Sequence, residues 1–174
     1  MKNYLRILLL ALAAVLVLSA CGPSDADKEK AAAAEAAAEA AKPVPAPAAN
    51  ADQTAWQKYL VAVVEKNMQG VKTDHPFMYY VPPGDDDATA AGRNAQLDNV
   101  SDAVARGVLP GNMLAFGGPD SKTTADFVVQ AFANANAGTF KGVVVLFVGA
   151  AADSDRVKAA LEKSGAEYRF VEVK

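Results

Sequence analysis

The sequence predicts an α/β fold for residues 53–174, in the form of a small three-layer sandwich with a mostly parallel sheet of about four strands. Short apolar runs alternate with stretches whose apolar residues recur at helical spacing. Glycine and proline residues mark the boundaries between these runs. Residues 143–148 are apolar throughout, without the alternation of a half-exposed strand. Such a run is typical of a central parallel strand with both faces covered.

The first element is a predicted helix that begins at Thr54. Thr54 and Gln57 have the spacing of a capping box, in which each side chain bonds the other residue's backbone amide. We expect Gly70 to end this helix. Its buried face is predicted to contain Trp56, Leu60, Val63 and Val64.

A strand is predicted next, over residues 77–81, between Pro76 and the pair Pro82-Pro83. Adjacent residues of a strand point to opposite faces, so Tyr79 and Tyr80 cannot both face one core. We expect one of them to be partly exposed and available for contact with a partner.

Residues 85–87 are three aspartates that precede a predicted helix over residues 94–106. Clustered carboxylates attract divalent cations, but the spacing is not that of a calcium-binding loop. The simpler interpretation is a solvated loop that caps the helix. The inward residues of that helix are predicted to be Leu97, Val100 and Val104, and Gly107 ends it.

The C-terminal half predicts a βαβαβ unit, whose crossovers should be right-handed. Strands are expected over residues 112–116, 142–149 and 168–173, with a helix over residues 121–134 between the first two. A second helix is expected to begin at Asp153 or Ser154 and to end at Ser164-Gly165. Arg169 and Glu172 make the last strand a predicted edge of the sheet.

The N-terminal residues 1–20 have the order of a secretory signal peptide. Lys2 and Arg6 precede an apolar run over residues 7–18, which is shorter than a membrane-spanning helix requires. The run Leu18-Ser19-Ala20-Cys21 follows and resembles the lipobox of bacterial lipoproteins. This resemblance implies that the Cys21 sulfur receives a diacylglyceryl group, that the peptide bond before it is cut, and that the new amine is acylated.

The predicted site of the anchored protein is the periplasmic face of the outer membrane. Gly22 stands where an inner-membrane retention signal of such lipoproteins would carry aspartate. In a single-membrane organism the same signal implies the outer face of the plasma membrane. Two or three acyl chains make the anchor effectively permanent.

Residues 21–52 are predicted to form a tether between the lipid and the domain. Residues 24–41 are rich in alanine with spaced charges, which is typical of a partly helical spacer. Pro43, Pro45 and Pro47 then favour extended polyproline geometry. Together these segments reach on the order of 50 Å.

Composition excludes several function classes. Cys21 is the single cysteine, so lipidation would leave no thiol for disulfide or redox chemistry, and His75 is the single histidine. Residues 53–174 carry 12 Lys and Arg against 14 Asp and Glu, so no nucleic-acid partner is expected. No hydrolase motif is present. The sequence predicts no catalytic residue, no metal site and no cofactor.

The loop of residues 117–124 follows a predicted strand and is the candidate ligand site. Backbone amides and a lysine at a helix start can hold an anion. The candidate ligand-binding residues are Gly117, Gly118, Ser121, Lys122 and Thr123. The loop is not a phosphate-binding P-loop, because Ser121 precedes the lysine where that motif has glycine. The simpler interpretation is a tight turn with an N-cap at Asp120 or Ser121.

Three functions remain open. The first is a lipid-anchored, non-enzymatic module that binds an envelope protein, favoured by the long tether and the missing catalytic motifs. The alternative is small-anion binding or hydrolysis at loops 117–124 and 149–154. The third is a structural envelope lipoprotein. An inward-pointing Lys122 would favour the second hypothesis, and a closed loop would favour the first.

Overall fold

The structure is a computed structural model that describes residues 44–174. The predicted signal peptide, Cys21 and the first part of the predicted tether lie outside the described residues. No helix within residues 44–174 is both long and apolar enough to cross a bilayer. The helices and strands are, in order, α3 (Gln53–Lys66), β1 (Phe77–Tyr80), α4 (Asp87–Arg106), β2 (Met113–Gly117), α5 (Ser121–Phe132), β3 (Val144–Gly149), α6 (Ala151–Leu161), η1 (Glu162–Ser164) and β4 (Glu167–Glu172).

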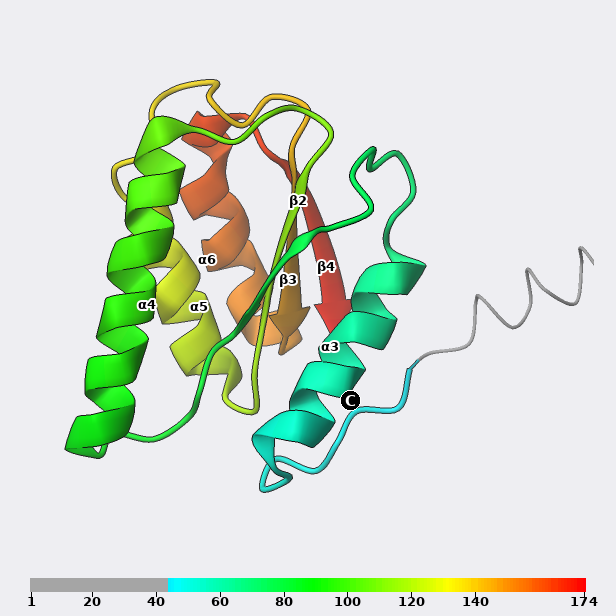
Figure 1. Cartoon of the computed structure of the whole chain (residues 1–174), viewed down its shortest axis with the longest axis vertical. Coiled ribbons are helices and arrows are strands. Elements are labelled where there is room, and N and C mark those ends of the chain that lie inside the picture. The colour runs from blue at the N-terminus through cyan, green and yellow to red at the C-terminus, as the bar shows by residue number, and fades with distance from the viewer. Residues whose placement is uncertain (1–43) are drawn as a thin grey trace, which may run out of the picture. The chain divides into compact units, whose positions relative to one another are not determined.

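The four strands form one sheet that is parallel throughout, in the order β1-β2-β3-β4. Each strand therefore pairs with its neighbour in sequence. Because every crossover moves in the same direction, α4, α5 and α6 all pack on one face, and α3 covers the other (Figure 1). The predicted three-layer α/β fold is confirmed, as is the position of the last strand at a sheet edge.

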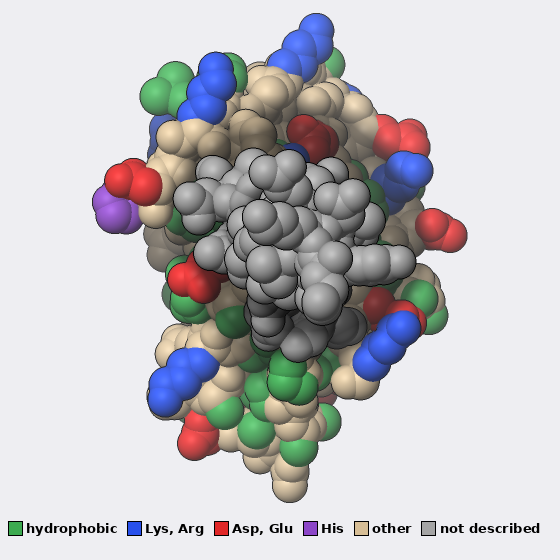
Figure 2. Space-filling view, turned by 90° about the vertical axis from the view of Figure 1, so that its right-hand side faces the viewer, with side chains coloured by type: hydrophobic (Ala, Val, Ile, Leu, Met, Phe, Trp, Pro, Cys, Tyr) green, Lys and Arg blue, Asp and Glu red, His purple; other side chains and the backbone are tan. Residues whose placement is uncertain are grey.

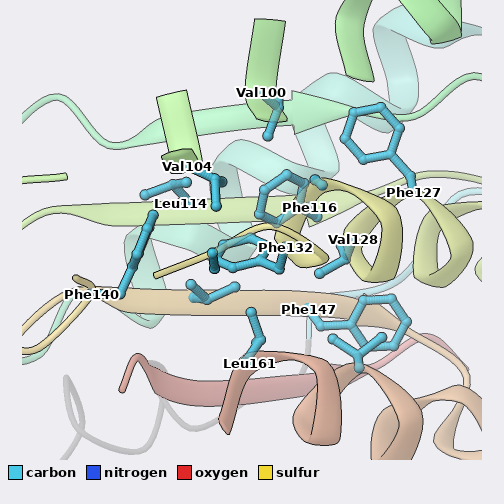
Figure 3. Packing of buried hydrophobic residues seen from close by; sticks show 14 of the residues in the cluster. Val100, Val104, Leu114, Phe116, Phe127, Val128, Phe132, Phe140, Phe147 and Leu161 are labelled. Carbon is cyan, nitrogen blue, oxygen red and sulfur yellow. The ribbon is translucent and has the colours of Figure 1, made fainter. Parts of the chain in front are cut away.

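The core beneath α4, α5 and α6 is built around aromatic rings. Phe116 of β2 is fully buried, and its ring stacks on that of Tyr79 with 4.9 Å between centroids. Phe127 and Phe132 of α5 approach the same ring at 6.1 and 6.4 Å. Figure 3 shows Phe116, Phe127 and Phe132 between the helices and the sheet. Offset and edge-on ring contacts of this kind add to the stabilisation from burial.

The core on the opposite face is built by α3. The predicted buried residues of this helix are all buried, and they pack on the alternate residues of β2 and β3. Residues 44–51 also lie against this core. Trp56 Nε1 donates a hydrogen bond to the carbonyl of Ala48 at 3.2 Å, and Val44 and Ala46 pack on the cluster. The last residues of the predicted tether are therefore held on the domain.

Helix α3 begins and ends earlier than the sequence indicates. Its N-cap is Asp52, which accepts from the Ala55 amide at 2.7 Å, so the predicted cap at Thr54 is wrong. The helix ends at Lys66 rather than near Gly70. Aspartate is among the residues preferred at the N-cap, and Asp52 directly precedes Gln53, the first residue of the helix.

Helices α4 and α6 also begin earlier than predicted. The N-cap of α4 is Asp86, which accepts from the Thr89 amide at 3.0 Å, so the aspartate run caps the helix as the simpler interpretation expects. Helix α6 begins after Ala150, which provides no side-chain cap. The predicted cap at Asp153 or Ser154 is therefore wrong, because Asp153 lies inside the first turn.

Candidate functional site

The two candidate loops meet at the carboxyl edge of the sheet, after β2 and β3. Ser121 links them, because its hydroxyl donates to Asp153 Oδ2 at 2.6 Å and accepts from the Ala150 amide at 2.7 Å. The Ser121 hydroxyl thus replaces the missing cap of α6. A group that already bonds two partners across the loops offers little to a ligand.

Gly117 and Gly118 are needed for close packing of the chain. A Cβ atom at Gly118 would lie 2.2 Å from the carbonyl oxygen of Val81, and one at Gly117 would lie 2.4 Å from Leu60 Cδ2. Both separations are too short for real side chains. The space beside these glycines is filled by Val81, the residue after β1, and by Leu60 of α3, so packing alone accounts for glycine at both positions.

Lys122 and Thr123 are also engaged within the domain. Lys122 Nζ pairs with Asp126 Oδ2 at 3.0 Å, and its side chain is 79% exposed, so it does not point into the fold. The Thr123 amide donates to Asp120 Oδ1 at 2.6 Å, which identifies Asp120 as the N-cap of α5. The loop therefore has the geometry of a capped turn.

Arg156 of α6 joins the two loops electrostatically. Its guanidinium bonds the carboxylates of Asp126 and Asp153 and donates to the carbonyl of Lys122 at 3.0 Å. The hydrogen bond from Arg156, followed by that from Lys122, holds the pKa of Asp126 below its usual value. The same contact to Asp126 raises the pKa of Arg156. The charge of Arg156 is therefore balanced by the carboxylates of Asp126 and Asp153.

A polar groove of about 400 Å³ lies beside Lys122, between the first turns of α4 and α5. Three carboxylates line it, those of Asp85, Asp120 and Asp126, against the cations Arg93 and Lys122. Arg93 donates to the carbonyl of Gly84 at 2.7 Å and pairs with Asp85. The excess of negative charge disfavours an anion in this groove.

Removing the Ser121 hydroxyl tests whether the loops are closed by it. We expect Ser121→Ala to lower the free energy of unfolding by about 1–2 kcal/mol, because the Ala150 amide and Asp153 lose a partner. Urea denaturation followed by the fluorescence of Trp56, the single tryptophan, measures this change. Ser101→Ala within α4 is the control and should cost nothing. A higher melting temperature of the unaltered protein in millimolar phosphate would contradict the closed-loop interpretation.

A second candidate site is the β1 surface, which we define by Val61, Phe77, Met78 and Tyr80. Phe77 and Met78 are 48% and 43% exposed, and Val61 of α3 is 39% exposed. Next to them lies a shallow groove of about 170 Å³, lined by Gln57, Leu60, Val61, Met78 and Tyr80. Val61, Met78 and Tyr80 meet at this groove, and Phe77 lies on the opposite face of the same strand. Exposed apolar side chains beside a groove are typical of contact surfaces.

The two edges of the sheet differ in charge. Strand β4 carries Glu167, Arg169 and Glu172, which are the charged residues that discourage pairing with another chain. Strand β1 has the sequence FMYY and carries no charge. Figure 1 shows β1 between α4 and α3, with no helix or strand of the described residues along its outer side. The β4 edge is therefore charged, and the β1 edge is uncharged and is covered in part by Gln96 of α4, whose Nε2 donates to the Tyr80 carbonyl.

The remaining polar residues of the described part of the chain form no metal-binding cluster. Within residues 44–174, no three His, Cys, Asp or Glu side chains lie close enough together to hold a metal ion. The His75 side chain is 92% exposed, and its Nε2 lies 3.7 Å from Oδ1 of Asp74. On the face shown in Figure 2, positive and negative side chains are interspersed outside the grey region.

Sequence reasoning identified the tyrosines of β1 but missed Phe77 and Met78. Tyr79 and Tyr80 are both half-buried, on opposite faces of the sheet, and burial raises the pKa of each hydroxyl. The exposed pair lies at the start of the strand instead. Its exposure depends on β1 being an edge, which the strand order decides and the local sequence does not.

Comparison with known proteins adds no relative. No protein-family model matches the chain. Searches of curated proteins and of solved structures also find no match.

Proposed function

We propose that the chain is a lipid-anchored envelope protein whose α/β domain binds a protein partner and performs no catalysis. The observation that carries this proposal is the uncharged edge of β1, which no other described strand pairs with and along which Phe77 and Met78 are half-exposed. Exposed apolar side chains beside an unpaired, uncharged strand edge are features that binding modules use to dock a partner.

The geometry of the loops supports docking over small-ligand binding. Ser121 bonds Asp153 and Ala150 of the other loop, Lys122 pairs with Asp126 within α5, and the adjacent groove has an excess of carboxylates. A ligand that entered there would have to break these contacts. The anchor supports the same proposal, because a tether that holds a domain at a distance from a membrane is useful for reaching a fixed partner.

The anchor is tested by Cys21→Ser. We expect this variant to accumulate as an uncleaved, unlipidated precursor, since the proposed modification needs the thiol as its nucleophile. Labelling cells with radioactive palmitate and measuring the mass of the mature N-terminus provide the readout. Cys21→Ser protein that is still cleaved and still labelled would overturn the anchor.

Docking is tested in cells by site-specific photo-crosslinking from exposed positions of the full chain. We expect one adduct of defined mass from Met78, and none from Leu109, which is 77% exposed and lies before β2. The adduct should disappear when the protein carries Cys21→Ser, because detachment removes the effective concentration that the anchor supplies. The absence of any adduct from every exposed position would overturn the proposed function.

A further inference from the structure

We propose that the outer edge of β1 takes one extended segment of a partner protein as an additional strand, and that this segment has basic residues beyond its ends. The inference rests on the proposed docking function and identifies the chemistry of the partner. It depends on three observations: the direction of the backbone groups of β1, the side chain of Gln96, and the charge around the strand.

The backbone of β1 presents hydrogen-bonding groups outward. The Val81 amide donates to the carbonyl of Gly117 at 2.9 Å, so Val81 turns its backbone toward β2. Backbone groups alternate along a strand, so Met78 and Tyr80 turn theirs away from the sheet. Pro76 and Pro82 flank the strand and limit the ladder that a partner can form to these few residues.

The side chain of Gln96 in α4 covers part of this edge, and only one end of its amide group is hydrogen-bonded. Its Nε2 donates to the carbonyl of Tyr80 at 3.2 Å. Its Oε1 is buried and has no hydrogen-bond partner among the described residues. A buried acceptor without a partner is unfavourable, so an incoming backbone amide that replaced Nε2 would release Gln96 to water. Gln96 therefore covers the edge weakly.

The side chains beside the edge define one pocket for the added strand. The groove between α3 and β1 is walled by Leu60, Val61 and Met78 and has a volume of about 170 Å³. This space is similar to that of an apolar cavity that holds one aromatic ring. An extended segment on β1 would direct alternate side chains to this face, so one large apolar side chain fits there.

The charge around β1 selects the partner. Residues 74–102 contain six aspartates and one arginine, a formal net charge of −5, while the whole chain carries −3. Asp74 and Asp85 lie on either side of the strand with side chains 89% and 99% exposed. A second copy of the chain would bring two such regions together and be repelled, whereas basic residues at both ends of a segment would be attracted.

The experiment uses the full chain in detergent and a fluorescent peptide, Lys-Lys-Thr-Val-Thr-Phe-Thr-Val-Lys-Lys. Binding is measured by fluorescence anisotropy. We expect the peptide to bind at least about tenfold more tightly than a version with glutamate at every lysine. N-methylation of one alternate set of its backbone amides should abolish binding, and methylation of the other set should not, because only every second amide of the added strand faces β1.

Variants of the protein locate the binding edge. Met78→Lys should weaken binding about tenfold, and Gln96→Ala should strengthen it about threefold by exposing the Tyr80 carbonyl. Leu109→Lys is the matched control, since it places the same charge on an exposed apolar residue outside the β1 surface. Exchange of the Met78 amide hydrogen should slow about tenfold with peptide bound.

Two results would overturn the inference. One is equal binding by the two N-methylated peptides with unchanged exchange at Met78. The other is concentration-dependent dimerisation of the chain that Met78→Lys prevents, which would make a second copy the occupant. An adduct in cells from a surface other than β1 would leave the proposed docking function standing while this inference failed.

Discussion

We expect Gly118→Ala to lower the free energy of unfolding by about 3 kcal/mol, in the upper part of the range for overpacked sites. The added methyl group would meet the carbonyl oxygen of Val81 at 2.2 Å. A backbone atom cannot rotate aside as a flexible side chain does, so the residue after β1 and the residue after β2 would have to separate. Urea denaturation followed by Trp56 fluorescence measures the loss.

Gly92→Ala is the matched control for this substitution. Gly92 lies within α4, and nothing lies within 4 Å of the position of its missing Cβ. Alanine is the better helix former, so this variant should gain about 0.5–1 kcal/mol. If the two variants instead shifted the unfolding midpoint in the same direction, the contact between Gly118 and Val81 would not limit the packing of this region.

The second large effect is expected at the centre of the aromatic core. Phe116→Ala should destabilise the domain by about 4 kcal/mol, because it removes a fully buried ring and leaves a cavity. The rings of Tyr79, Phe127 and Phe132, within 6.4 Å of its centroid, would each lose a neighbour.

Phe77→Ala serves as the control for the size of the removed ring. Phe77 is 48% exposed at the start of β1, so its removal should cost less than about 1 kcal/mol. The urea midpoints of the two variants, with the slope of the transition compared to that of the unaltered protein, give the difference. Similar losses for Phe77 and Phe116 would mean that the ring cluster does not hold the core together.

The regular parts of the fold could be predicted from periodicity and breakers. The apolar run that forms β3 indicated a central strand, and this strand is fully buried between β2 and β4. The charges of Arg169 and Glu172 indicated an edge, and β4 is one. In each case the prediction uses only a few consecutive residues. Their polarity indicates whether the strand is buried on both sides or lies at an edge.

The remaining features depend on contacts between distant residues. Helix α6 begins after Ala150, whose amide is capped by Ser121 from 29 residues away, and no local pattern reports such a cap. Residues 44–51 have the composition of a spacer, and their packing depends on the Trp56 side chain and the surface of α3. The seven residues before Asn94 lack a large apolar side chain, so the first turns of α4 gave no periodic signal.

In the candidate ligand loop, too, some features follow from local sequence and others from contacts with distant residues. Its place at the carboxyl edge and its capping residue Asp120 follow from the order of strand, loop and helix. That Gly118 lies against Val81, and that Ser121 reaches Asp153, follow from how β1 and α6 approach the loop. A sequence motif for an anion site and a tight packing turn use the same residues, and only the neighbours distinguish them.

Because strand order matches chain order, the sheet can assemble in the direction of synthesis. Paired residues such as Phe116 with Phe147, or Phe147 with Phe170, are only 31 and 23 positions apart. A sheet in chain order closes shorter loops than a sheet with rearranged strands would, and this lowers the entropy cost of each pairing. Among the strands of residues 44–174, the charged β4 and the uncharged β1 each have one neighbour, so any further strand would meet least repulsion at β1.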